Sequence, residues 1–182
     1  HGVLQERVQT FDLTDGIGFS PNARHALVRV TTTSHTDAWL AVVDLPSLAT
    51  RVVARLHDDA WLGGPLGWTA GWLKDGETVY YGSEETGYAH LYTVFAAGGK
   101  PRALTSGAWE VHEVELSPDG RAFYLHTSEG DFGQVHFSAL DVASGRRTRI
   151  TSAEGRQSLA AKANPAPAPR VPNTPGSSQE SG

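Results

Sequence analysis

The segment Leu116-Ser-Pro-Asp-Gly-Arg121 decides the fold, because a large apolar residue and a tight turn lead there into a β-rich run. Proline presets φ, aspartate bonds back to the backbone, and glycine accepts a positive φ. The same arrangement occurs at Phe19-Ser-Pro-Asn-Ala-Arg24 and at Trp72-Leu-Lys-Asp-Gly-Glu77, each again followed by β-prone residues. The chain therefore contains an internal repeat of three units.

Each unit continues into a second hairpin. The expected strand pairs are 39–44 with 51–54, 90–95 with 102–105, and 135–141 with 147–151. Together with the apolar run before each turn they give four strands per unit, and no segment shows a helical apolar period. A repeat of about 40–50 residues with four strands is typical of β-propeller blades. A β-sandwich is the structural alternative, but it does not require the same order of turn and hairpin three times.

The predicted fold class is all-β, with about three four-stranded blades of an incomplete β-propeller. The expected divisions are a lead-in at 1–10, blades near 11–63, 64–109 and 110–152, and a tail at 153–182. Three blades do not close a ring of 4–8, and the chain contains no Met. We therefore expect a piece of a longer gene product, with two bare blade faces lined by residues such as Val28, Val30, Tyr124 and Leu125.

The Ala-, Pro- and Ser-rich tail at 153–182 is expected to be disordered. Five of the ten prolines lie there, and Leu159 and Val171 are its only large aliphatic residues. Such a segment cannot bury enough apolar area to offset the entropy of ordering it.

Composition excludes several classes of protein. The net charge is −5 with both signs mixed along the chain, so a basic footprint for nucleic acid is missing. No apolar run approaches the roughly 18–20 residues of a membrane-spanning helix. The absence of Cys excludes disulfides and thiolate sites, but it leaves the compartment open between cytoplasmic and periplasmic or secreted.

The most specific stretch is Tyr80-Tyr-Gly-Ser-Glu-Glu-Thr-Gly-Tyr-Ala-His-Leu-Tyr92, followed by Leu104-Thr-Ser-Gly-Ala-Trp-Glu-Val111 and Leu116-Ser-Pro-Asp-Gly120. This series resembles the N-terminal propeller of the prolyl oligopeptidase family of serine peptidases, in particular the dipeptidyl peptidase IV branch. The resemblance covers about 68–152 well and 11–67 weakly. It implies a propeller of seven or eight blades that forms a lid over an α/β-hydrolase domain.

The motif residues are predicted to be structural. They are Gly87, Tyr88, His90, Leu91, Tyr92, Trp109, Glu110, Pro118, Asp119 and Gly120. We expect the tyrosines and Leu91 to stack against neighbouring blades and Trp109 to plug the space between two blades. His90 is expected to satisfy a backbone or carboxylate partner, and Trp61, Trp68 and Trp72 to belong to the core. The glycine-rich segment 63–67 beside them is expected to form a flexible loop that could contact substrate.

No catalytic residues are predicted. Acyl transfer in the family requires a nucleophile elbow, Gly-x-Ser-x-Gly, and no serine of this chain has that context. Enzymes of the dipeptidyl peptidase IV branch hold a substrate ammonium with a glutamate pair, but that pair lies on an earlier helical segment. Glu84-Glu85 falls in the turn of the motif instead, so we expect a solvated turn there.

Metal and cofactor sites are not expected. His112, His126 and His136 lack metal-ligand spacing, and His57-Asp58-Asp59 is interpreted as a polar loop between blades rather than a cation site. No phosphate-binding loop is present, which leaves nucleotide cofactors unsupported.

The sequence therefore predicts a non-catalytic propeller segment of a peptidase that acts on short peptides. The expected partners are an α/β-hydrolase catalytic domain and a peptide substrate, and a homo-oligomer stays open. The alternative is a stand-alone propeller that binds proteins, as in periplasmic propellers with similar turns. Substrate binding cannot be assigned to particular residues.

Overall fold

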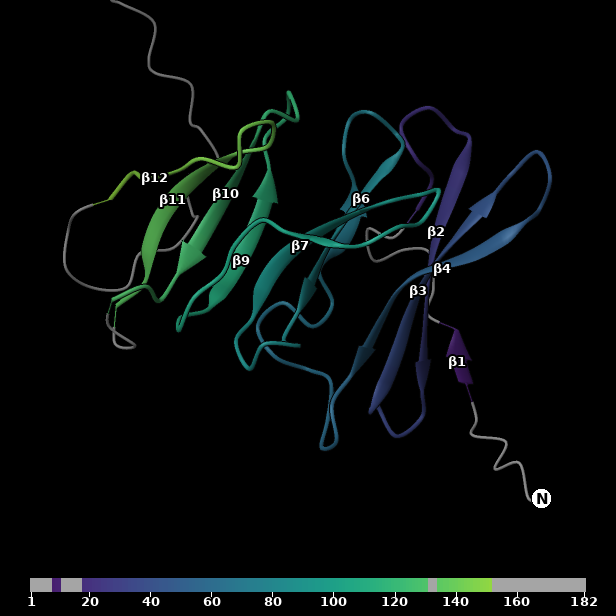
Figure 1. Ribbon diagram of the computed structural model, residues 1–182, viewed down its shortest axis with the longest axis horizontal. Helices are drawn as coiled ribbons and strands as arrows, with labels where there is room; N and C mark the ends of the chain where they lie inside the picture. Colours follow the sequence, from purple (N-terminus) through teal and green to yellow (C-terminus); the bar gives the residue numbers. More distant parts are fainter. Residues whose placement is uncertain (1–7, 11–17, 131–133, 152–182) are drawn as a thin grey trace, which may run out of the picture.

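The computed structural model describes residues 8–10, 18–130 and 134–151. These ranges hold twelve strands and no helix. The strands form three antiparallel sheets of four, and the sheets stand side by side as separate blades (Figure 1). The tail expected at 153–182 lies outside the described residues.

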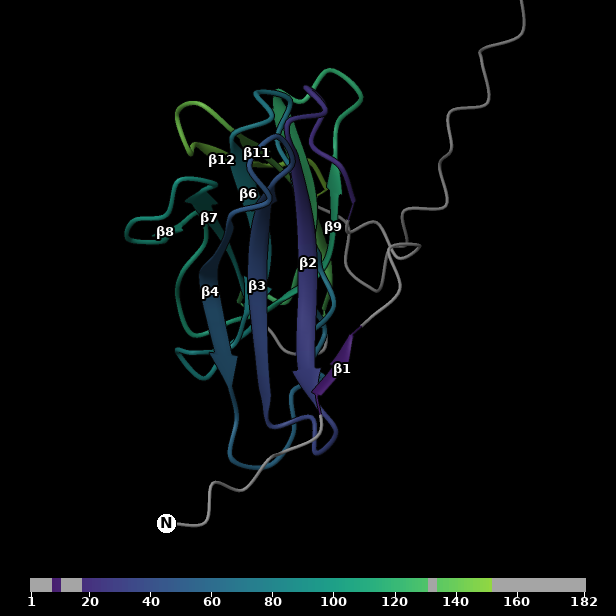
Figure 2. The same ribbon diagram turned by 90° about the vertical axis from the view of Figure 1, so that its right-hand side faces the viewer.

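Each sheet is a simple meander in which every strand pairs with the next along the chain. The first sheet consists of β1 (Val8–Thr10), β2 (His25–Thr32), β3 (Asp37–Asp44) and β4 (Thr50–His57). The second consists of β5 (Ala70–Trp72), β6 (Thr78–Ser83), β7 (His90–Phe95) and β8 (Arg102–Ala103). The third consists of β9 (Val111–Leu116), β10 (Ala122–Thr127), β11 (His136–Asp141) and β12 (Arg147–Arg149). In Figure 2 the first sheet faces the viewer, with β2, β3 and β4 side by side.

The first sheet begins earlier than the sequence suggests. Strand β1 lies inside the segment 1–10 that we interpreted as a lead-in, and its Val8 pairs with Thr32 of β2. The three residues of this strand carry no turn signal before them, so the repeat pattern does not show it.

The repeated turn before the second strand of a sheet has the same hydrogen bonds in the first and third sheets. In both, a serine hydroxyl donates to the side chain two residues on, at 2.6 Å. The same hydroxyl accepts the backbone N–H five residues on, at 2.9 and 3.0 Å. The residues are Ser20, Asn22 and His25 in the first sheet, and Ser117, Asp119 and Ala122 in the third. The sequence repeat is therefore a repeat of local structure.

Glycine at this turn permits close packing between sheets. Gly76 and Gly120 have φ of 69° and 73°. A Cβ on Gly76 would lie 2.6 Å from the Asn22 side chain of the preceding sheet, and one on Gly120 would overlap Lys74 of its preceding sheet. The first sheet has Ala23 at the equivalent position, with φ of 54°.

The core consists of two layers between the three sheets. The first layer joins the first and second sheets through residues such as Leu27, Leu40 and Val79. The second joins the second and third sheets through residues such as Leu91 and Phe123. Because the second sheet is covered on both faces, β6 and β7 are almost continuously buried, whereas β9 and β11 alternate.

Two expectations about the core are wrong. Trp72 is buried and its Nε1 donates to the carbonyl of Gly18, but Trp61 and Trp68 are 64% and 44% exposed. They lie in the connection after β4, outside the sheets. Leu125, which we expected on a bare blade face, is fully buried against the second sheet. Side chains alternate along a strand, so its neighbour Tyr124 occupies the outward face instead.

Candidate functional site

A recess lies where one end of the first sheet meets the second sheet. It is formed by the connection between β4 and β5 and by the turn between β6 and β7. The connection is tied to the β2–β3 turn, because Leu62 N donates to the His35 carbonyl at 2.7 Å and Asp58 N to the Thr36 carbonyl at 3.0 Å. Three segments distant in sequence are thus held together at this end.

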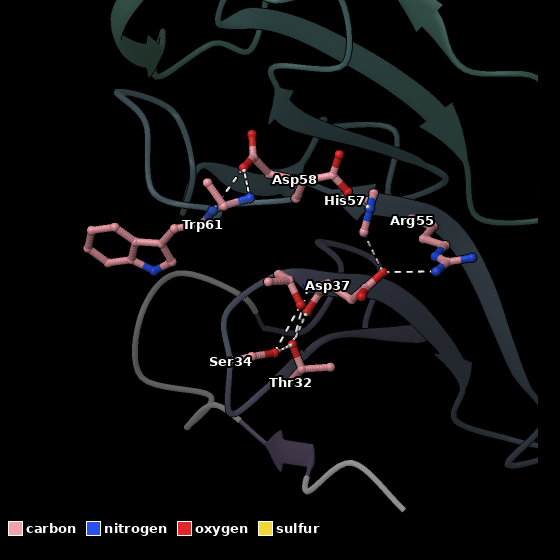
Figure 3. A network of polar contacts seen from close by, with 10 residues as sticks. Thr32, Ser34, Asp37, Arg55, His57, Asp58 and Trp61 are labelled. Carbon is pink, nitrogen blue, oxygen red and sulfur yellow. Dashed lines mark hydrogen bonds and ion pairs between the residues drawn. The ribbon is translucent and has the colours of Figure 1, made fainter. Parts of the chain in front are cut away.

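Asp37 organises the polar side of this end (Figure 3). Its Oδ1 accepts from Arg55 Nη2 at 2.9 Å and lies 3.0 Å from Nδ1 of His57. The register explains the grouping, because Asp37 pairs directly with His57 across the β3–β4 ladder. The Arg55 hydrogen bond is the main cause that lowers the pKa of the Asp37 carboxyl.

His57 has a carboxylate at each ring nitrogen. Nε2 lies 3.1 Å from Asp59 Oδ1, and Nδ1 faces Asp37. A neutral imidazole donates from only one nitrogen, whereas the imidazolium donates from both. The hydrogen bond to Asp59, followed by that to Asp37, therefore raises the pKa of His57.

Asp58 starts the connection by capping its first turn. Its Oδ1 accepts the backbone N–H groups of Ala60 and Trp61, at 2.7 and 2.8 Å. These two hydrogen bonds lower the pKa of Asp58, and the bond from Trp61 contributes most. His57 thus ends β4, and Asp58 and Asp59 follow it at the border of two blades.

Glycines let the connection lie directly on the second sheet. A Cβ on Gly64 would overlap the carboxyl group of Glu84, and a Cβ on Gly82 would overlap Leu66. Gly67 is less crowded, since its Cβ would lie 3.1 Å from the backbone of Gly63. The loop expected to be flexible is therefore closely packed.

We expected Glu84 to lie in a solvated turn, and this expectation is wrong. Its side chain is half-buried, and Oε1 has no hydrogen-bond partner. Burial contributes most to raising the pKa of Glu84, and the negative charges of Glu110 and Asp58 raise it further. The adjacent Glu85 is exposed, so the two glutamates have different surroundings.

A buried cation lies near the same end. Arg29, 2% exposed, has its guanidinium carbon 4.5 Å from the centre of the Trp68 ring. Its Nε has no hydrogen-bond partner, and burial lowers the pKa of Arg29 to about 10. The ring of Trp68 also meets His35 edge-on, with 6.1 Å between centroids.

The recess can hold one small polar group rather than a whole ligand. Its volume is about 40 Å³, room for very few water molecules. Its lining carries charges of both signs, since Arg55 and His57 border it together with Asp58, Glu84 and Glu85. Ser83 lies in the wall, but its hydroxyl accepts from Glu85 N at 3.3 Å and sits on no nucleophile elbow. This arrangement offers no acyl-transfer chemistry.

Four of the predicted motif residues, His90, Leu91, Tyr92 and Trp109, lie between the blades. His90 is buried with Nδ1 3.1 Å from Thr105 Oγ1 and Nε2 3.0 Å from the Gly107 carbonyl, and its ring meets Trp109 edge-on. Leu91 belongs to the second core layer, and Tyr92 stacks on Tyr81 in the first.

The other motif residues lie in turns and connections. Tyr88 is half-buried in the β6–β7 connection, where Gly87 has a φ of 84°. Glu110 exchanges hydrogen bonds with Ser128, at 3.0 Å in each direction. Pro118, Asp119 and Gly120 form the turn before β10.

Sequence reasoning missed Arg29, Asp37 and Gly82 at this end, because they look like ordinary strand residues. Gly64 belongs to the glycine-rich segment 63–67, which the sequence did single out.

These observations define the class of protein. Three four-stranded blades with a repeated turn, packed face to face, are a part of a β-propeller. The chain belongs to the family "Dipeptidyl peptidase IV (DPP IV) N-terminal region", whose model matches residues 8–166.

Similar proteins fall into two groups. A probable dipeptidyl peptidase 4 of Aspergillus clavatus is 40% identical over 95 residues, which are 48% of this chain and 12% of the relative. The Tol-Pal system protein TolB of Francisella tularensis is 29% identical over 112 residues, or 62% of this chain and 24% of that protein. The chain thus spans a small part of the relatives it matches.

Solved structures support the same fold. Porphyromonas gingivalis dipeptidyl peptidase 4 aligns with a TM-score of 0.64 and 23% identity, over 76% of this chain and 19% of that one. TolB from Acinetobacter baumannii aligns with a TM-score of 0.51 and 15% identity, over 80% of this chain and 32% of that one.

The described residues contain neither a candidate membrane span nor a candidate metal cluster. No helix there is long and apolar enough to cross a membrane. Within the same residues, no three His, Asp or Glu side chains are grouped to hold a metal ion.

Proposed function

We propose that this chain is a non-catalytic propeller segment of a dipeptidyl peptidase IV-like serine peptidase. In the intact protein it would act as part of a lid that limits access to short peptides. Membership of the DPP IV N-terminal family carries the proposal. The lack of a nucleophile elbow anywhere in the sequence agrees with a role outside the chemistry. An α/β-hydrolase domain elsewhere in the protein would supply serine, aspartate and histidine.

The first test uses the chain alone. Purified protein should show no hydrolysis of a chromogenic prolyl dipeptide substrate, because no activated serine is present. Turnover that a serine-directed inhibitor abolishes would contradict the proposal.

The second test uses the gene beyond codon 182. A downstream Gly-x-Ser-x-Gly supports the peptidase, whereas a stop codon or further blades alone contradict it.

In the longer enzyme, Gly64→Val should displace the β4–β5 connection and change the ratio of kcat/KM for a dipeptide substrate to that for a longer peptide. Ala103→Val, on the exposed edge strand β8, is the matched control and should leave this ratio unchanged.

A stand-alone module that binds proteins is the second candidate. The similarity to TolB, in sequence and in fold, favours it. The same reading of the gene separates the two, because a binding module needs no hydrolase domain.

A further inference from the structure

The connection between β4 and β5, residues 58–69, is held by a titratable side chain on each side. On the first sheet, His57 lies between two carboxylates, with Nε2 3.1 Å from Asp59 of the connection and Nδ1 3.0 Å from Asp37 of β3 (Figure 3). On the second sheet, the carboxyl group of Glu84 lies directly beneath Gly64 of the connection. Both blades therefore contact the connection through a group that gains or loses a proton.

The imidazolium form of His57 joins the connection to the first sheet. A charged ring donates from both nitrogens and satisfies Asp37 and Asp59 together, whereas a neutral ring donates from only one. Asp37 has a second partner in Arg55, whose Nη2 donates to it at 2.9 Å. Loss of the proton from His57 therefore leaves one of the two carboxylates without a hydrogen bond from the ring, and the link from β3 to the connection is broken.

The neutral form of Glu84 fits beneath the connection. Its Oε1 is buried with no hydrogen-bond partner, and a Cβ on Gly64 would overlap this carboxyl group. An ionised carboxylate in this place loses its water without gaining a donor. The buried oxygen can recover water only if the connection moves away from the second sheet.

The charges around both groups are mostly negative and favour the protonated forms. The charged groups that face His57 come from β3, β4 and the connection, and they are Asp37, Arg55, Asp58 and Asp59. Those around Glu84 come from the connection, its own turn and the segment before β9, and they are Asp58, Glu85 and Glu110. Only one of these groups, Arg55, is a cation, and it is already paired with Asp37.

We propose that the β4–β5 connection is a pH-responsive cover of the recess, packed on both blades while His57 and Glu84 carry their protons and released when they lose them. Histidine is the side chain whose ordinary charge change lies closest to neutral pH, so the release falls in a range that a protein meets in use. The inference concerns a movement within the described chain. It goes beyond the proposed function and does not depend on it.

Both deprotonations weaken the packed state in the same direction. The pKa of His57 is raised above its ordinary value of 6.5, so its hold is complete below 6.5 and is lost as the pH rises through the folded pKa. The pKa of Glu84 is raised above 4.5, so its ionisation begins to oppose the packed state above 4.5 and does so fully once the pH has passed the folded pKa. Rising pH therefore releases the connection from both sheets.

Hydrogen exchange measures the release directly. The amides of Asp58 and Leu62 donate to carbonyls of the β2–β3 turn, so they report whether the connection is in place. Between pH 5 and pH 8 their protection, corrected for the intrinsic rate, should fall by about threefold, a modest change because exposed ion pairs are weak. Amides of β10, in the third sheet, are the internal reference and should keep their protection. Constant protection of Asp58 and Leu62, or a fall shared with β10, would overturn the proposal.

Variants assign the change to the two side chains. His57→Arg keeps a permanent cation with several donors and should hold the connection at pH 8. Glu84→Gln is neutral at every pH and should remove the remaining part of the change. The double variant should therefore show equal protection at pH 5 and pH 8. A double variant that still loses protection as the pH rises would overturn the proposal.

Two further variants control for the loss of a histidine. His57→Gln is neutral at every pH, so at pH 5 it should already show lower protection of Asp58 and Leu62 than the unaltered chain. His112→Gln, on β9 of the third sheet, is the matched control and should follow the unaltered chain at both pH values. If His112→Gln abolished the change, or His57→Gln left it intact, the assignment to His57 would be wrong.

Discussion

At the scale of single residues, the close approach of Gly64 explains the unusual state of Glu84. The connection covers one carboxyl oxygen of Glu84 and provides no donor for it. The protonated form of the carboxyl group is therefore favoured in the folded protein relative to the unfolded chain. Ionisation of Glu84 opposes folding here, in contrast to a carboxylate such as Asp37 that has a cationic partner.

The first prediction concerns this carboxyl group. Because its folded pKa is raised, its ionisation should lower the free energy of unfolding as the pH rises from about 4.5 through the folded pKa. Glu84→Gln should remove this loss and raise stability at pH 7 by less than about 1 kcal/mol. Urea unfolding between pH 4 and 8 measures it. The exposed Glu85→Gln is the control, and a loss of stability in Glu84→Gln would contradict the argument.

The second prediction concerns equivalent turns. Gly120→Ala should lower the free energy of unfolding by about 1–3 kcal/mol, because the new Cβ meets Lys74 and φ is positive. Ala23→Gly should instead be neutral or raise it by up to about 1 kcal/mol, since relief of strain exceeds the entropy of glycine. Thermal unfolding of both variants compares them. If the two substitutions changed the free energy of unfolding by equal amounts in opposite directions, contact with the preceding sheet would contribute nothing at Gly120.

At the scale of elements, the connection between the second and third sheets depends on Trp109. Its ring is 8% exposed, meets His90 edge-on at 5.1 Å between centroids, and has the guanidinium carbon of Arg147 4.2 Å from its centre. Residues from β7, β12 and the connection thus meet on one side chain. The position of Trp109 agrees with the role expected for it, which is to fill the space between two blades.

The third prediction tests this role. Trp109→Ala should lower the free energy of unfolding by about 3–5 kcal/mol, the usual range for a buried tryptophan. Trp109→Phe keeps an aromatic ring in place and should cost clearly less. Denaturant unfolding measures both. A change below about 1 kcal/mol in Trp109→Ala would show that the ring contributes little to packing.

At the scale of the whole molecule, stability should be greatest in the middle. The second sheet is covered on both faces, whereas the first and third each present one face on which no other described sheet packs. Local opening therefore costs least at the two outer sheets.

The fourth prediction follows from this arrangement. Backbone amides of β6 and β7 should exchange with deuterium more slowly than those of β3 and β11. Hydrogen-exchange mass spectrometry measures the difference. Uniform protection of all three sheets would contradict the expectation that the middle sheet is the most stable.

The sequence by itself determined the repeat, the all-β class and most strand positions. Turn residues such as Pro118, Asp119 and Gly120 act through bonds to neighbours within five residues, so their effect can be read along the chain. The motif from Tyr80 to Tyr92 likewise identified the family.

Only the tertiary structure decided which side chains are covered. Trp61 and Trp72 are both apolar aromatic residues, yet only Trp72 lies between two sheets. Glu84 and Glu85 are adjacent and identical, yet only Glu84 meets the connection from residue 64. These differences arise from contacts between segments far apart in sequence, and the energies of desolvation and packing depend on which segments meet.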